Sequence, residues 1–201
     1  MIDNLELIKP LLNFSEPGDF YYLLVLKRKK DQPEGEKDNH QSVRTIKTYC
    51  IDSIEYLEKR YEEIKLLCEM FKARAYIQVQ KQNHKDVSLN MMVTLAQRIQ
   101  DGSHKQDGLF SSVVGQIKTH EKRWICDIDE KTPELVNQVM DFIDSLEPVG
   151  SKIETCLPTK DGYHLITKRF DSKTFSEQYP EITLQKKNPT LIFLPKSLNY
   201  E

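Results

Sequence analysis

A short apolar run that ends in two acids constrains this chain more than any other stretch of its sequence. Residues 123–129 read Arg-Trp-Ile-Cys-Asp-Ile-Asp, and side chains of a β-strand alternate between the two faces of a sheet. Trp124 and every second residue after it therefore share one face, whereas Ile125, Asp127 and Asp129 share the other. Aspartate is a poor strand former and is costly beside a core, so its placement here indicates a functional role.

Asp127 and Asp129 are spaced so that they can hold a divalent cation between them. Magnesium prefers carboxylate oxygens and keeps some of its waters for substrate phosphates, so both acids are candidate ligands of Mg²⁺ or Mn²⁺. The alternative is a strand end at which both acids are merely solvated, because about one such triplet is expected by chance in a chain of this composition.

The composition is that of a globular protein without a general affinity for polyanions. The 201 residues are 38% hydrophobic and 30% charged, with a net charge of -2, so a contact with nucleic acid would need a local basic patch. No apolar run reaches membrane length and no signal peptide is evident, which predicts a cytoplasmic protein with no membrane association. The cysteines are far apart, which predicts reduced thiols rather than a zinc site; they are Cys50, Cys68, Cys126 and Cys156.

The first half of the chain predicts an α/β unit over residues 1–110. Strands at 20–26 and 44–51 flank a polar, exposed hairpin loop, about 27–44, that begins with the basic cluster 27–30. This cluster is either a solvated strand end or a set of phosphate contacts. Apolar residues at helical spacing predict a helix over 53–72.

A strand and a second helix follow within this unit. The strand at 73–80 alternates, with Arg74 and Tyr76 on a face that borders either a polar cleft or solvent. The helix starts at Asp86 or Ser88 and ends near Gly102, and its methionines are expected to fill the core.

The second half predicts a split βαββαβ arrangement over an antiparallel sheet, covering residues 111–201. Its strands are expected at 123–129, 152–157, 163–168 and 190–194, with helices after Thr132 and Asp171. The first and third strands are then neighbours at the centre of the sheet. Asp127, Asp129 and His164 would therefore meet on one face, in an active-site cleft between the two units of an α+β fold.

The two motifs together resemble those of the archaeo-eukaryotic primase superfamily. Residues 125–129 match its first motif, an apolar strand ending in two acids, and residues 162–164, Gly-Tyr-His, match its second. The resemblance implies an α/β unit followed by an RRM-like unit. It also implies metal-dependent phosphodiester formation from nucleoside triphosphates on a DNA or RNA template, together with other replication proteins as partners.

The same resemblance implies roles for particular residues. Asp127 and Asp129 would bind magnesium or manganese, and His164 would contact the incoming triphosphate as the third catalytic residue. Lys160 or Lys168 would assist in binding the nucleotide. Arg74 would face the same cleft from the first unit.

The chain departs from the family at its third motif, which supplies a further aspartate. No aspartate follows Asp171, so Asn188 or Glu181 would have to take the place of the third acid. The chain is then an active divergent member of the family, a partial site completed in trans, or an inactive relative.

Two other classes of protein stay open. One is a metal-dependent nuclease; the other is a non-catalytic nucleic-acid-binding module, which would need exposed aromatic residues, whereas Trp124 and Tyr163 are predicted to face the helices.

Overall fold

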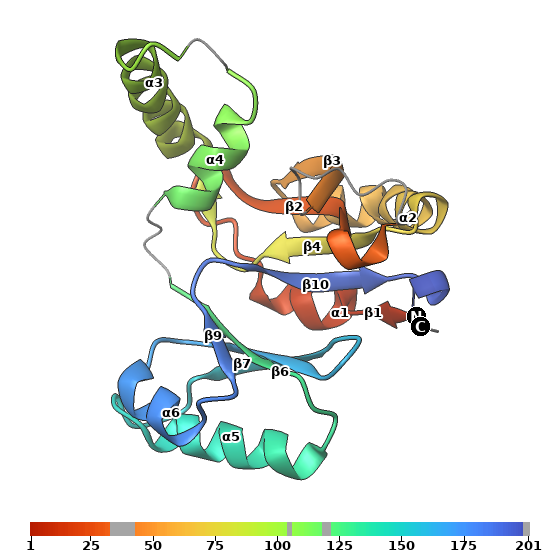
Figure 1. The fold of residues 1–201 in the computed structure, drawn as a ribbon, viewed down its shortest axis with the longest axis vertical. Helices are drawn as coiled ribbons and strands as arrows, with labels where there is room; N and C mark the ends of the chain where they lie inside the picture. Colours follow the sequence, from red (N-terminus) through yellow and green to blue (C-terminus); the bar gives the residue numbers. More distant parts are fainter. Residues whose placement is uncertain (33–42, 104–105, 118–121, 199–201) are drawn as a thin grey trace.

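The computed structural model describes residues 1–32, 43–103, 106–117 and 122–198, so most of the predicted hairpin loop lies outside the described residues. The described chain forms an α+β fold with two antiparallel sheets (Figure 1). Each sheet carries its own helices, and the first sheet lies above the second in the view of Figure 1.

The first sheet has the strand order β1-β10-β4-β2-β3, with β5 paired to β2. Its strands are β1 (Ile2–Asp3), β2 (Asp19–Arg28), β3 (Val43–Ile51), β4 (Arg74–Gln78), β5 (Gln82–Asn83) and β10 (Pro189–Leu194). The short elements around it are α1 (Leu5–Ile8), η1 (Lys9–Leu11), η2 (Lys29–Asp31) and η4 (Lys196–Leu198). Residues 1–19, which carry no clear pattern in the sequence, thus supply an edge strand and two short helices.

Helix α2 (Ile54–Phe71) covers one face of the first sheet. It begins where the Ser53 hydroxyl accepts a hydrogen bond from the Tyr56 amide, and it ends at Lys72, whose φ is 46°. Its buried stripe, which packs on the sheet as its spacing predicts, consists of Leu57, Tyr61, Ile64 and Cys68.

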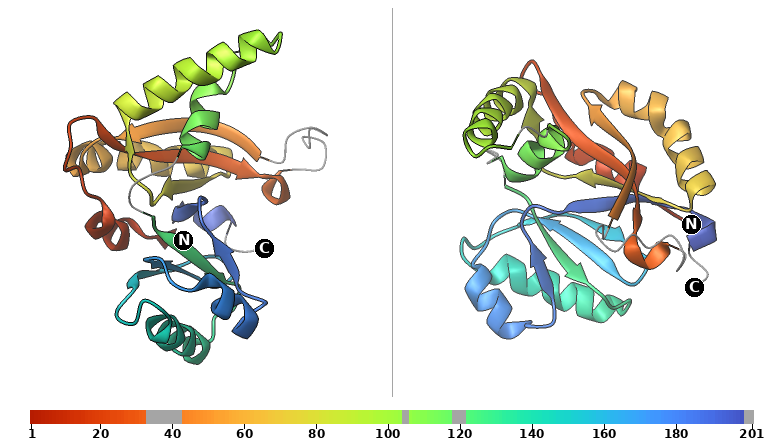
Figure 2. Two further views of the ribbon diagram at one scale, coloured as in Figure 1. Left: turned by 90° about the vertical axis from the view of Figure 1, so that its left-hand side faces the viewer. Right: turned by 45° about the horizontal axis from the view of Figure 1, so that its top comes forward.

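Helices α3 (His84–Gln100) and α4 (Leu109–Gln116) cover one end of the opposite face and extend away from the body of the protein (Figures 1 and 2). Helix α3 starts earlier than predicted, because the Asn83 side chain accepts a hydrogen bond from the Lys85 amide. The expectation that its methionines fill the core is wrong for Met92, which is 69% exposed. Val87, in the first turn of α3, is the one buried residue of this fully described helix, because the rest of the helix projects beyond the sheet.

The second sheet has the order β7-β8-β6-β9. Its strands are β6 (Trp124–Ile128), β7 (Ile153–Pro158), β8 (Tyr163–Thr167) and β9 (Thr183–Gln185), and its helices are α5 (Pro133–Ser145) and α6 (Ser172–Gln178). As predicted, β6 and β8 are central neighbours. Trp124, Cys126 and Ile128 pack against the two helices, together with Tyr163.

The prediction that residues 190–194 form the last strand of this sheet is wrong. Residues 190–194 form β10 of the first sheet, between β1 and β4, and the three-residue β9 takes the expected place beside β6. An apolar run such as Thr-Leu-Ile-Phe-Leu predicts a buried strand but does not specify the sheet that it joins. The chain therefore returns to the first sheet after completing the second.

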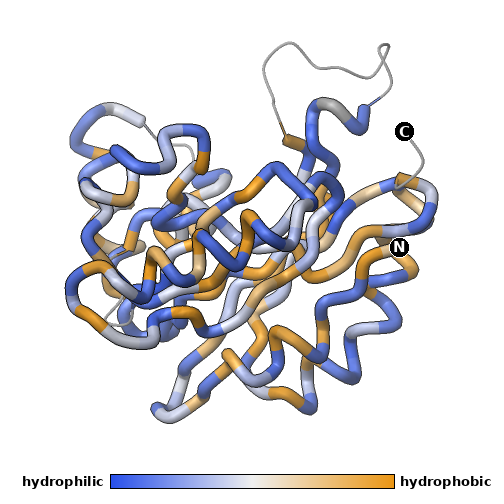
Figure 3. Tube along the Cα trace, turned by 90° about the horizontal axis from the view of Figure 1, so that it is seen from below, coloured by the Kyte–Doolittle hydropathy of each residue, from blue (hydrophilic) through white to orange (hydrophobic). Residues whose placement is uncertain are grey.

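The two sheets share a hydrophobic core. Ile125, Leu157 and Ile166 of the second sheet belong to the same cluster as Ile8 and Leu11, which α1 and η1 contribute from the first. Hydropathy alternates along the helices, with orange and blue segments following each other (Figure 3). The second sheet therefore has an apolar region on the face that points away from α5 and α6. The site described below occupies the other end of that face.

Two expectations from composition concern thiols and membranes. The four cysteines are free, and burial raises the pKa of the Cys68 and Cys126 thiols to about 12. In the part of the chain that the structure describes, no helix combines the length and apolarity needed to cross a bilayer.

Candidate functional site

A cavity of about 540 Å³ lies between the two sheets, within the range of ligand-binding pockets. The second sheet and its hairpin contribute Asp127, Asp129, Thr159, Lys160, Asp161, His164 and Gln185 to its lining. The first sheet and the segment before β10 contribute Leu26, Arg28, Val43, Arg74, Tyr76, Asn188, Pro189 and Leu191. The polar face predicted for β4 thus borders the cavity through Arg74 and Tyr76, while Ala75 and Ile77 face the core.

Asp127 and His164 form the centre of the site. They are cross-strand partners on β6 and β8, so the alternation of both strands turns their side chains to the same face. His164 Nε2 lies 3.2 Å from Asp127 Oδ1, and the two side chains are 10% and 23% exposed. Asp129 follows the end of β6, is exposed, and lines the same cavity.

Two further polar side chains hold this pair in place. Gln185 Nε2 donates to Asp127 Oδ2 at 2.7 Å, and Thr190 Oγ1 lies 2.8 Å from His164 Nδ1, with the direction of that bond set by the tautomer. The hydrogen bond from His164 holds the pKa of the Asp127 carboxyl below its usual value, aided by the charge of Arg28 and opposed by burial. Since Thr190 belongs to β10, His164 links the two sheets.

Gly162 brings the hairpin of β7 and β8 against the end of β6. A Cβ at this position would lie 1.8 Å from the Ile128 carbonyl oxygen and 2.7 Å from the Glu130 amide nitrogen. Only glycine permits so close an approach of two backbones. The small residue of the Gly-Tyr-His motif therefore places the Lys160 turn beside Asp129.

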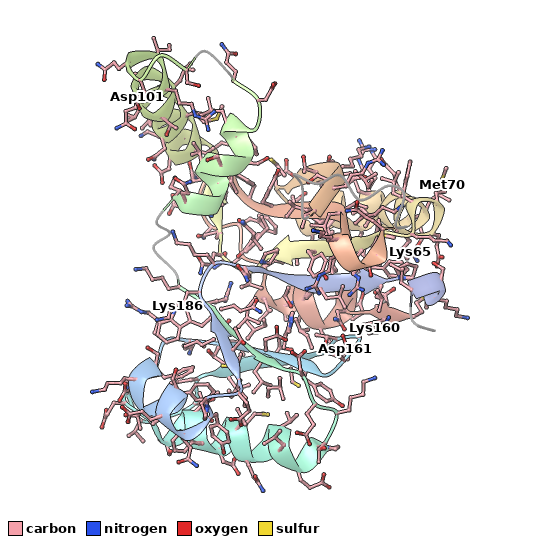
Figure 4. The ribbon with its side chains drawn as sticks, viewed as in Figure 1. Lys65, Met70, Asp101, Lys160, Asp161 and Lys186 are labelled. Atoms are coloured by element: carbon pink, nitrogen blue, oxygen red, sulfur yellow. The ribbon has the colours of Figure 1, made fainter. Side chains whose placement is uncertain are left out.

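The cations of the cavity differ in their availability. Arg74, predicted to bind nucleotide, is 3% exposed and forms two hydrogen bonds of 2.7 and 2.8 Å with Asp31. Among the described residues, neither Lys160 nor Arg28 has a hydrogen-bond or ion-pair partner. Figure 4 shows Lys160 on the hairpin turn, next to Asp161, at the gap between the sheets.

Other predicted residues fall inside and outside the cavity. Lys168 is exposed and does not line it, because β8 ends at Thr167 and the chain then turns away. Of the two candidates for the absent third acid, Asn188 lines the cavity and Glu181 does not.

The donor set fits a magnesium ion that arrives with phosphate oxygens rather than a preformed protein site. Both carboxylate oxygens of Asp127 already accept hydrogen bonds, and no three histidine, cysteine or acidic residues are grouped to hold a metal among residues 1–32, 43–103, 106–117 and 122–198. Magnesium is commonly held by one or two carboxylates, several waters and substrate phosphates. Asp127, by exchanging its bond to Gln185, and Asp129 would supply the two carboxylates.

Two residues of the site escape sequence reasoning, and a third, Arg28, was anticipated only as a member of a basic cluster that could contact phosphates. Gln185 lies on β9, which is too short to carry a periodic signal, and Thr190 lies on a strand that was expected in the other sheet. Arg28 is part of the basic cluster 27–30, whose position at a strand end was the available signal.

Comparisons with models of known protein families, with curated proteins and with solved structures found no match to this chain.

Proposed function

We propose that this chain is a primase-polymerase-like nucleotidyltransferase with an RRM-like second unit, which acts in the cytoplasm on nucleoside triphosphates and nucleic acid. One observation carries the proposal. Asp127, Asp129 and His164 from one sheet and Arg28 from the other line a single cavity of about 540 Å³, which is large enough for a nucleotide. The strand order β9-β6-β8-β7, with helices after β6 and β8, supports the RRM-like assignment.

The charges of the cavity suit a triphosphate. Lys160 and Arg28 approach it from different sheets, and neither forms a hydrogen bond or ion pair with another described residue, so both are available to phosphate oxygens. A magnesium ion held by Asp127 and Asp129 would neutralise phosphate charge and polarise the phosphorus that is attacked. The acids and the cations thus serve different parts of one ligand.

His164 would act chiefly by fixing the site. Its two ring nitrogens face Asp127 and Thr190, so the orientation of the imidazole is set before a ligand binds. For His164 to donate to a phosphate oxygen, one of these two hydrogen bonds must be exchanged for the ligand. If the bond to Thr190 is the one exchanged, the Asp127 carboxylate remains as the group that holds the ring.

The binding half of the proposal is tested by calorimetry with a nucleoside triphosphate and Mg²⁺ or Mn²⁺. Lys160→Gln removes a charged contact to phosphate and should weaken binding about tenfold. Lys168→Gln removes the same charge outside the cavity and is the matched control. Equal effects of the two substitutions, or no binding by the wild type, would contradict the proposal.

The transfer half is tested with the same proteins by extension of a primed template and by synthesis on a bare one. Manganese should support more incorporation than magnesium, because it tolerates a less regular ligand set. Asn188→Asp should raise the magnesium-supported rate by adding a charged ligand, and Asp129→Asn should abolish it while leaving the fold intact. No incorporation by any of these proteins would rule out transfer.

A second candidate is a module that binds a triphosphate without transferring it. The observation that favours it is that Asp127 already accepts two hydrogen bonds, from His164 and Gln185. Triphosphate binding that depends on Lys160, combined with no incorporation, would establish this candidate over the first.

A further inference from the structure

Two cations converge on one indole ring at the opposite end of β6 from the acids. Lys186 Nζ lies 4.7 Å from the centroid of the Trp124 ring, and the Arg169 guanidinium carbon lies 5.9 Å from it. The two residues come from different neighbours of β6, because Arg169 follows β8 and Lys186 follows β9. Trp124 is 7% exposed, so the ring forms a floor on which both exposed cations lie.

Neither cation is neutralised by another residue that the structure describes. In the described part of the chain, Arg169 and Lys186 have no ion pair, and the neighbouring Arg123 is already paired with Glu154. Lys168, next to Arg169 in the sequence, adds another exposed positive charge. Like charges held together without a counter-ion repel each other, and a bound anion would relieve that repulsion. The cluster is therefore a local basic patch on a chain whose net charge is -2.

The main chain around Lys186 is fixed while its side chain stays available. Gln80 Nε2 donates to the Lys186 carbonyl oxygen at 2.6 Å, and Lys187 Nζ donates to the Gln116 carbonyl oxygen at 3.0 Å. Gln185 and Asn188, on either side of this pair, line the cavity. The same short segment thus joins the cavity to the basic patch.

We propose that Arg169 and Lys186 bind phosphates of a single-stranded nucleic acid whose end enters the cavity. This inference rests on the proposed function and names the path of its polymer substrate. Trp124 and Asp127 are three residues apart on β6, or roughly 10 Å at the rise of a strand, but they lie on opposite faces of the sheet. A strand bound at the patch would therefore turn around the end of β6 to reach the acids within a few nucleotides. Figure 4 shows Lys186 and Lys160 at opposite ends of the gap between the sheets.

The strand must be single because it has to turn around the end of β6 within a few nucleotides. A duplex, with a persistence length of about 150 base pairs, is too stiff for such a turn. The contacts would be to phosphates rather than bases, since the Trp124 ring is covered by the two cations and turned towards the helices, and the Phe170 ring that packs against it is buried. Such contacts bind strands of any sequence.

The test uses Trp124, the only tryptophan of the chain, as a built-in reporter. The full-length protein is titrated with an oligothymidylate of about 16 nucleotides while tryptophan emission is recorded, and binding is followed in parallel by the anisotropy of a labelled copy. The emission should change on binding, because phosphates draw both cations away from the ring. Arg169→Gln combined with Lys186→Gln should weaken binding about tenfold and reduce the slope of log affinity against log salt by about 1.4, the value for two contacts on a single strand.

Lys59→Gln combined with Lys85→Gln is the matched control. Both lysines are exposed, on α2 and α3, and their removal changes the net charge by the same amount. This protein should bind the oligonucleotide with the affinity and salt slope of the wild type. If it loses affinity equally, binding reflects net charge and the assignment to Arg169 and Lys186 is overturned.

Calorimetry with a nucleoside triphosphate separates this inference from the proposed function. The Arg169 and Lys186 double variant should bind the triphosphate as the wild type does, because neither residue lines the cavity. The proposed path is overturned if this variant binds the oligonucleotide as tightly as the wild type does. It is also overturned if the wild type binds the oligonucleotide without a change in tryptophan emission. Both conclusions hold whether or not the triphosphate binds. If the wild type binds the oligonucleotide as expected but does not bind the triphosphate, the proposed function is overturned and the phosphate contacts stand.

Discussion

A side chain at position 162 would collide with the backbone of β6, and this makes Gly162 the most sensitive single residue of the site. Gly162→Ala places a Cβ 1.8 Å from the Ile128 carbonyl oxygen, so the hairpin must move away from Asp129. We expect a loss of about 3 kcal/mol in the free energy of unfolding, measured by urea denaturation.

Gly115→Ala is the control for this prediction. Gly115 lies in α4 and has no atom within 4 Å of its Cβ position. Alanine there should leave the free energy of unfolding unchanged or raise it by about 0.5 kcal/mol. It reduces the conformational entropy of the unfolded chain and has a higher helix propensity than glycine. Similar denaturation midpoints for the two variants would show that the approach of the hairpin to β6 is not tight.

At the same scale, the part of the site that follows from strand alternation could be predicted from the sequence. The period of two on β6 and β8 correctly put Asp127 and His164 on one face, because only neighbouring strands were needed. The partners of Arg74 and His164 could not be predicted, since Asp31 and Thr190 reach them from segments distant in sequence. Lys168 was misplaced because β8 ends one residue earlier than its composition indicates.

Among the elements, helix α5 depends on one buried lysine at its carboxyl end. Lys152 is 3% exposed, and its Nζ donates to the carbonyl oxygens of Asp144, Leu146, Pro148 and Gly150 at 2.8 to 3.1 Å. Lys152→Met keeps the volume but leaves these oxygens unpaired. We expect a loss of about 3 kcal/mol, because hydrogen bonds to a charged group are strong and unpaired buried acceptors are costly, measured by thermal and urea unfolding.

Lys131→Met, at the other end of the same helix, serves as the comparison. Lys131 is exposed, so its replacement should change stability by no more than about 0.5 kcal/mol. A Lys152→Met protein as stable as the Lys131→Met protein would mean that water replaces the ammonium group without cost.

Most elements could be predicted because they carry local signals. Ser53 and Asp171 accept amide hydrogen bonds at the starts of α2 and α6, as their sequence positions indicate. Strand β9 has only three residues and no periodic pattern, so it was missed. The assignment of β10 to the wrong sheet has a different cause, because apolarity reports burial and not the identity of the neighbouring strand.

For the whole molecule, the position of β10 predicts that the first unit does not fold alone. A fragment of residues 1–117 lacks the strand that lies between β1 and β4, so β4 has an open edge and β1 has no partner. We expect this fragment to show no cooperative unfolding transition by circular dichroism. Mixing it with a fragment of residues 122–201 should restore one, and a cooperative transition of residues 1–117 alone would contradict this expectation.

The late return of the chain to the first sheet also has a consequence for its synthesis. Strand β4 leaves the ribosome about 110 residues before β10 does, which corresponds to roughly 5 to 20 s of translation. During that interval the nascent chain exposes an unpaired strand edge, the kind of surface that other chains can pair with. A chaperone that covers nascent chains should therefore associate with this protein until its last strand has emerged, and slowing translation before β10 should increase aggregation.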